Sequence, residues 1–98
     1  MPDNTVKVRI VEINGFCPVY KLGDEFKIRA GYVLEGREQH CMHALSALLP
    51  YYIALSRGVQ PSSLGLCKEG ENVAYVQCPD PQKNTGGGTV VLELSLEE

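Results

Sequence analysis

The amino-acid sequence predicts an α+β fold in which one main helix packs on one face of a small, mostly antiparallel sheet. Two segments with alternating apolar and polar residues precede residue 31, and two more follow residue 72. A single run rich in alanine and leucine lies between them. Because alternation leaves one apolar face on every strand, the helix is expected to cover that face, in the order strand, strand, helix, strand, strand.

The first two strands are predicted at residues 5–13 and 26–30. In the first, apolar β-branched residues recur at every second position and are separated by lysine and arginine. Asn14-Gly15 ends this strand because both residues tolerate a positive φ. Gly23-Asp24 marks the turn before the second strand, and the short connection favours antiparallel pairing.

The main helix is predicted over residues 41–57, where alanine, leucine and methionine predominate, and Gly58 follows as a terminator. Pro50 falls inside this run, so we expect it either to kink the helix or to begin a second one. A core-facing stripe with steps of three and four residues is expected from Leu45, Leu48, Leu49, Tyr52 and Leu55.

Two further strands are predicted at residues 73–78 and 90–96. Pro79-Asp80-Pro81 ends the first of them, and the glycine-rich segment 82–88 is expected to be a mobile surface loop. A chain this short buries a limited core, so we expect a homo-oligomer. The strands at 73–77 and 90–96 are expected to expose the edge for that pairing.

Composition and charge narrow the class of protein. The length predicts a single domain over residues 1–98, and 44% apolar with 21% charged residues is ordinary globular composition. Lysine and arginine are scattered and the net charge is −3, which argues against nucleic-acid binding. No segment approaches ~20 uninterrupted apolar residues, so no membrane span is expected. These features predict a cytoplasmic protein with reduced thiols.

The four cysteines form no Cys-x-x-Cys pair, which excludes a zinc ribbon or a ferredoxin run. Cys17 follows the first strand, Cys41 begins the helix and Cys78 ends the third strand. Ends of separate elements can converge at one edge of a small sandwich. Three thiolates there would suit zinc or a [4Fe–4S] cluster with one open iron position. Free cysteine is also among the most buried residue types, so the same thiols can simply be core residues.

Other side chains are candidates for supporting roles. His40 or His43 would supply the fourth ligand of a closed zinc site, although either can instead cap the helix or face solvent. Asp80 lies between two prolines and would orient a ligand through a hydrogen bond, unless it only shapes the turn. Cys41 beside the two histidines is the best candidate for a nucleophile.

Three groups of motifs carry a family resemblance: Cys17 with Gly23-Asp24, Cys41 with Ala44-Leu45 and Leu49-Pro50, and the run Cys78-Pro79-Asp80-Pro81. Over nearly its whole length the chain resembles an uncharacterised family of short bacterial and archaeal conserved hypothetical proteins. The resemblance implies that Cys17, Cys41 and Cys78 fall on family cysteines, whereas Cys67 does not. Some relatives carry a Gly-His step where Tyr20 stands here. The family implies a fold unit but no established reaction.

Three functions follow from these observations. The first is a small metal- or iron–sulfur-binding protein that uses Cys17, Cys41 and Cys78. The second is a non-catalytic interaction or oligomerisation module whose cysteines are structural. The third is a thiol enzyme with Cys41 as its nucleophile. Whether the protein is an enzyme stays open at this point.

Overall fold

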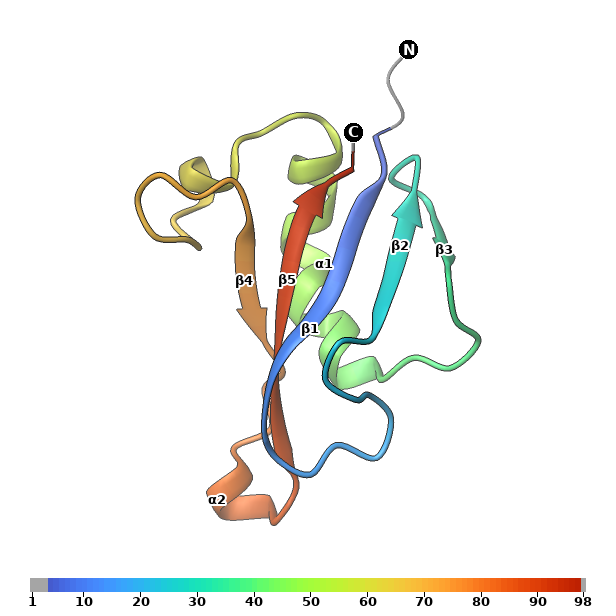
Figure 1. Ribbon diagram of the computed structural model, residues 1–98, viewed down its shortest axis with the longest axis vertical. Helices are drawn as coiled ribbons and strands as arrows, with labels where there is room; N and C mark the ends of the chain where they lie inside the picture. Colours follow the sequence, from blue (N-terminus) through green and yellow to red (C-terminus); the bar gives the residue numbers. More distant parts are fainter. Residues whose placement is uncertain (1–3, 98) are drawn as a thin grey trace.

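The computed structural model describes residues 4–97, which form a five-stranded antiparallel sheet with one main helix on one face (Figure 1). The spatial order of the strands is β3-β2-β1-β5-β4. The predicted α+β class and the single main helix are therefore confirmed. The elements along the chain are β1 (Val6–Gly15), β2 (Glu25–Arg29), β3 (Val33–Glu35), α1 (Met42–Ser56), a 3₁₀ turn (Pro61–Leu64), β4 (Ala74–Gln77), α2 (Gln82–Thr85) and β5 (Gly88–Leu96).

Two of these elements differ from the sequence prediction. The strand β3 is short and exposed at all of its positions, so it carries no alternating pattern from which to predict it. The segment expected to be a loop contains the single helical turn α2, which ends where Gly86 adopts a left-handed conformation with φ 73°. Neither difference changes the layers of the fold.

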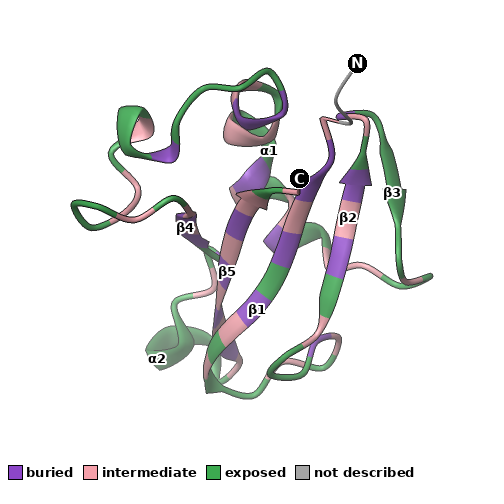
Figure 2. Cartoon of the chain, turned by 45° about the horizontal axis from the view of Figure 1, so that its top comes forward, coloured by how far each residue is buried: buried purple, intermediate pink, exposed green. Residues whose placement is uncertain are grey.

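The central strand β1 fixes the register of the sheet. It pairs antiparallel with β2 on one side and with β5 along its length on the other, from Val6 opposite Leu96 to Gly15 opposite Gly88. Buried and more exposed positions alternate along β5, and along β1 as far as Ile10, where the register shifts (Figure 2). This alternation directs one apolar face of the sheet toward α1, as the period of two predicts.

The helix α1 covers that face with a narrower stripe than the sequence predicts. Ala44, Leu48 and Leu55 are buried against the sheet. Leu49 was expected in the stripe, but its side chain is 52% exposed. One helix on a small sheet can bury only the side chains that point directly at the strands, and Leu49 lies about 100° around the helix from Leu48.

Pro50 lies inside α1 without starting a second helix. Proline has no amide hydrogen to donate to the carbonyl group four residues earlier, which belongs to Ser46. Ser46 and Pro50 are both exposed, so water can solvate the unpaired carbonyl group. Because the proline lies on the outer side of the helix, the missing hydrogen bond lowers the stability of the protein less than it would in the core.

The beginning of β5 lies unusually close to the loop that follows β1. A Cβ atom added at Gly88 would lie 2.6 Å from the carbonyl oxygen of Phe16, with the amide nitrogen of Phe16 equally near at 2.7 Å. Only glycine permits this approach, because the opposing atoms are backbone and cannot turn aside. The contact holds the Cys17 loop against the end of the sheet.

Candidate functional site

The three cysteines of the predicted site lie at ends of elements, as the sequence indicates. Cys17 is in the loop after β1, Cys41 is the N-cap residue of α1, and Cys78 directly follows β4. These positions belong to the same end of the sheet (Figure 1). Cys17 and Cys41 are half-buried, Cys78 is buried, and all three pack against the hydrophobic core as free thiols.

Tyr20 connects two of these cysteines. Its backbone amide donates to the sulfur of Cys17 at 3.3 Å, and its hydroxyl oxygen accepts a hydrogen bond from the backbone amide of Cys41 at 3.1 Å. The ring is 2% exposed, stacks on Phe26 and lies under the Arg37 guanidinium at 4.8 Å. Tyr20 thus satisfies a backbone donor at the start of α1, where helix amides have no partner within the helix.

The environment of Tyr20 keeps its hydroxyl group protonated. Burial raises the pKa of Tyr20 above its ordinary 10.0, and electrostatic repulsion from the Cys41 and Cys17 side chains raises it further. The hydrogen bond from the Cys41 amide and the charge of Arg37 lower this pKa, but burial is the larger effect.

Cys78 uses its sulfur within the turn that follows β4. The thiol lies 4.0 Å from the carbonyl oxygen of Gly88, to which it donates, and the sulfur accepts from the backbone amide of Asp80 at 3.4 Å. The Asp80 carboxylate instead accepts from the hydroxyl group of Thr85. Asp80 therefore touches Cys78 through its backbone, while its carboxylate shapes the turn.

The two histidines occupy different surroundings. His40 precedes α1 and packs edge-on against Phe26 with 4.8 Å between ring centroids, and neither of its ring nitrogens has a hydrogen-bond partner in the described chain. His43 is exposed on α1. Among residues 4–97, no hydrogen bond joins either histidine to the Cys41 thiol, so the contact with a base that activates a nucleophilic cysteine is not formed.

The predicted metal ligands do not form a close group among residues 4–97. Within the part of the chain that the structure describes, no three His, Cys, Asp or Glu side chains gather closely enough to hold a metal ion. Cys67, outside the predicted set, donates weakly to the Glu71 carbonyl oxygen at 3.7 Å. The three predicted thiols therefore share one end of the sheet without forming a ligand cluster.

A second surface, which the sequence analysis did not single out, lies on α1. From Gln39 to Ser56 the chain contains no Asp, Glu, Lys or Arg. Several large apolar side chains of this helix point away from the sheet: Met42 is 70% and Ile53 56% exposed, beside Leu49. The outer α1 face consists of Met42, His43, Ser46, Leu49, Pro50 and Ile53. In the sequence, this face could have been recognised from the long segment without charged residues.

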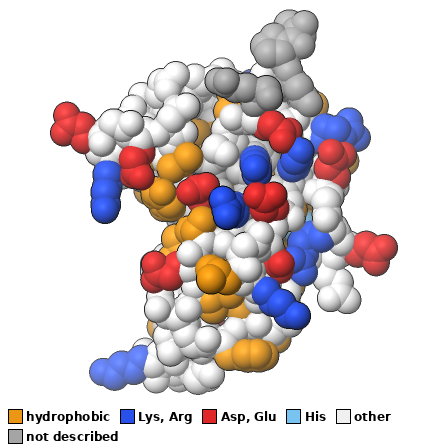
Figure 3. Space-filling view, in the orientation of Figure 1, with side chains coloured by type: hydrophobic (Ala, Val, Ile, Leu, Met, Phe, Trp, Pro, Cys, Tyr) orange, Lys and Arg blue, Asp and Glu red, His pale blue; other side chains and the backbone are white. Residues whose placement is uncertain are grey.

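The opposite side of the sheet has the reverse character. Basic and acidic side chains are interspersed with hydrophobic ones on this side in Figure 3, and several of the charged ones form ion pairs. Lys7 lies 3.4 Å from Glu25, and Arg29 lies 2.8 Å from Glu35. The open face of the sheet thus presents ionic side chains to solvent, whereas the outer α1 face carries no ionic side chain.

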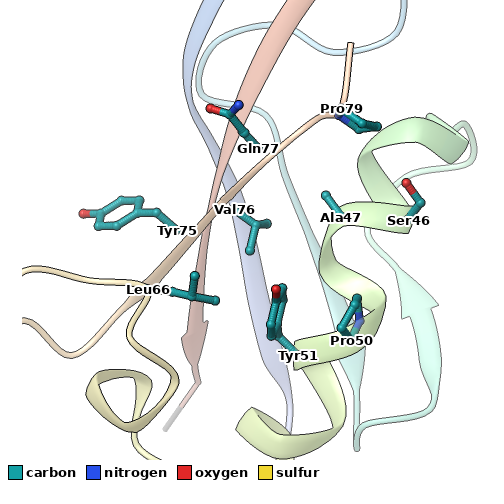
Figure 4. Close-up of a pocket in the computed structure, with 9 residues that line it drawn as sticks. All are labelled: Ser46, Ala47, Pro50, Tyr51, Leu66, Tyr75, Val76, Gln77 and Pro79. Atoms are coloured by element: carbon teal, nitrogen blue, oxygen red, sulfur yellow. The ribbon is translucent and has the colours of Figure 1, made fainter. Parts of the chain in front are cut away.

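Two grooves run along the sides of α1. The β3-side groove has a volume of about 170 Å³ and an apolar lining that includes Tyr32, Leu34, Leu49 and Tyr52. The β4-side groove is larger, about 480 Å³. In Figure 4, Leu66 and Val76 point into it from one side and Tyr51 from the other. The outer α1 face is therefore a ridge between two hollows.

The strand edges predicted for self-pairing are poorly available. β5 lies between β1 and β4, so the expectation that residues 90–96 form an edge is wrong. β4 is an edge strand, but the Tyr75 amide already donates to the Leu66 carbonyl oxygen at 2.8 Å, and Pro79 has no amide to offer. Proline and a covering loop are common protections of sheet edges.

Comparison of the chain with protein-family models, curated proteins and solved structures finds no match. The family resemblance described above therefore stays a prediction. No helix within residues 4–97 has the length and apolarity needed to cross a lipid bilayer.

Proposed function

We propose that this chain is a non-catalytic protein-interaction module that binds through the outer α1 face. The observation that carries the proposal is a surface helix without any charged side chain, whose outward Leu49 and Ile53 are more than half exposed. A helix that carries large apolar side chains on its outward side as well as its inward side is usually covered on both. The sheet covers only one side of α1, so a second surface is expected to cover the other.

The contacts of the cysteines support a structural role for them in such a module. Cys17 and Cys78 accept hydrogen bonds from nearby backbone amides, and Cys41 begins α1 with its amide bonded to Tyr20. All three pack against the core that supports α1. Their positions thus stabilise the elements that present the outer α1 face.

Site-specific photocrosslinking tests this function. A benzophenone amino acid at position 53 is expected to give a defined protein adduct in cells, because that side chain lies in the interface. The same probe at position 9, exposed on the open face of the sheet, serves as the control and should give none. The adduct should disappear when Leu49→Glu is added and should re-form with the purified partner. Absence of any adduct at position 53, or equal adducts from both positions, would contradict the proposal.

A second candidate function rests on Tyr20, which bonds to both Cys17 and Cys41 at the end of the sheet that also holds Cys78. We propose as this alternative a three-thiolate zinc or iron–sulfur site, formed after the three thiols move closer together. His40, whose ring nitrogens lack partners, would be available as a further ligand.

Metal analysis after anaerobic purification tests the alternative. It predicts near-stoichiometric zinc, or iron with acid-labile sulfide, that is lost on replacing Cys17, Cys41 or Cys78 with serine. Cys67→Ser is the matched control and should retain the metal. A folded wild-type protein without metal would rule this alternative out.

A further inference from the structure

We infer that the partner at the outer α1 face is a second copy of this chain, packed about a two-fold axis that passes Leu49 with the two α1 helices antiparallel. This inference rests on the proposed function and names its partner. Three features carry it: the shape of the face, the charges at its two ends, and the apolar area it offers.

The shape of the face is self-complementary. Leu45, Leu49 and Ile53 are four residues apart and form one ridge along α1, and the β3-side groove lies directly beside this ridge. Ridges of i, i+4 side chains fit into the grooves of a facing helix. About a two-fold axis, each ridge enters the other copy's groove. Leu49 is the central residue of Met42–Ser56, so antiparallel helices centred there cross at their midpoints.

The charges at the two ends of α1 also complement each other. Glu38 is exposed just before the helix, and Arg57 is exposed directly after it. Arg57 donates to the Tyr32 hydroxyl group at 2.7 Å and lies over that ring, at the border of the β3-side groove. With the axis at Leu49, position 57 of one copy lies opposite position 41 of the other, three residues from Glu38. The interface then has an uncharged centre and opposite charges at its rim, the usual arrangement of protein interfaces.

The exposed apolar side chains supply more than half of the area that a typical dimer interface buries. Tyr32, Leu34, Met42, Leu49 and Ile53 are between 42% and 73% exposed. Side chains of this size offer on the order of 150–200 Å² each when fully exposed, so their exposed fractions amount to roughly 500 Å² per copy. Typical specific interfaces bury about 800 Å² per partner. Ser46, Pro50 and His43, on the same face, contribute toward the remainder.

Other occupants fit the face less well. Helices that lie on membrane surfaces usually carry lysine or arginine along their polar side, whereas α1 has neither and the chain is net negative at −3. An added peptide strand would need a long free sheet edge, but the β4 edge is obstructed at Tyr75 and Pro79, and the β3 edge is only three residues long. A helix surface of the same kind, as in a second copy, matches the face best.

Sedimentation equilibrium of the purified chain tests the inference. The wild-type protein is expected to dimerise between low-micromolar and submillimolar concentration. Leu49→Glu should weaken the dimer at least about 30-fold, because two buried carboxylates would face each other at the axis. Leu22→Glu is the matched control, since Leu22 is 68% exposed in the loop between β1 and β2, and it should leave the dimer unchanged. Circular dichroism checks that each variant is folded.

Paired charge variants identify a symmetric partner. Ile53→Glu should be monomeric. Leu49→Glu and Leu49→Lys should also each be monomeric alone, and their equimolar mixture should recover heterodimers because opposite charges then meet at the two-fold axis. A wild-type monomer at all concentrations, a dimer that survives Leu49→Glu, or flotation of the monomer with anionic vesicles would each overturn the inference. In the crosslinking experiment, an adduct with a different protein would contradict only the identification of the partner as a second copy. The absence of any adduct would contradict the proposed function itself.

Discussion

Replacing Leu48 with alanine is expected to lower the free energy of unfolding by about 3 kcal/mol. Leu48 is 1% exposed and attaches the middle of α1 to the sheet, so its removal leaves a cavity between the two layers. Leu49→Ala removes the same atoms from the next residue, and it should cost well under about 1 kcal/mol because that side chain is largely exposed in the isolated chain.

The comparison needs a monomeric background. Urea denaturation of both variants should be measured in an Ile53→Glu protein, so that association does not add to the stability. Equal losses for the two leucines would mean that Leu49 is packed within the single chain, and the description of the outer α1 face would then be wrong.

Replacing Tyr20 with phenylalanine is expected to cost about 1–2 kcal/mol near neutral pH. The substitution keeps the ring against Phe26 but removes the oxygen that accepts from the Cys41 amide, leaving a half-buried donor without a partner at the start of α1. Urea denaturation at pH 7 of the wild type and the variant measures this loss. Equal stability would show that the hydrogen bond contributes nothing to the fold.

The same substitution should alter the response to alkaline pH. Because the folded-state pKa of Tyr20 is raised above 10.0, its contribution is fully present below about pH 10 and is lost as pH rises through the folded-state pKa. The variant lacks this loss, so the difference in free energy of unfolding between the wild type and the variant should become smaller above pH 10. A constant difference would contradict this role of Tyr20.

The layers of the fold could be predicted from the sequence because they depend on local periodicity. The alternation of Val6, Val8 and Ile10 identifies a strand with one buried face, and the run that follows Cys41 identifies the helix. The position of β5 between β1 and β4 could not be predicted in this way. Strand order is decided by pairing between distant segments, and an alternating pattern looks the same at an edge and at the centre.

The candidate sites, too, could be predicted only where the local sequence decides them. The sequence places Cys17, Cys41 and Cys78 at ends of elements, but the separation of their sulfur atoms depends on loops whose path follows from contacts such as Gly88 against Phe16. The outer α1 face was visible in the sequence as a long segment without charge. It was overlooked because periodicity assigns Leu49 to the core, and only the width of the sheet decides which side chains are covered.

The central claim is that another surface covers the outer α1 face in solution, and methyl NMR with a soluble paramagnetic probe tests it most directly. In the isolated chain, the methyl groups of Ile53 and Leu22 are both largely exposed, at 56% and 68%. At high protein concentration we expect strong broadening of Leu22 but protection of Ile53 and Leu49, with the protection lost on dilution. Equal broadening of all three residues at every concentration would show a face open to water and would contradict the account.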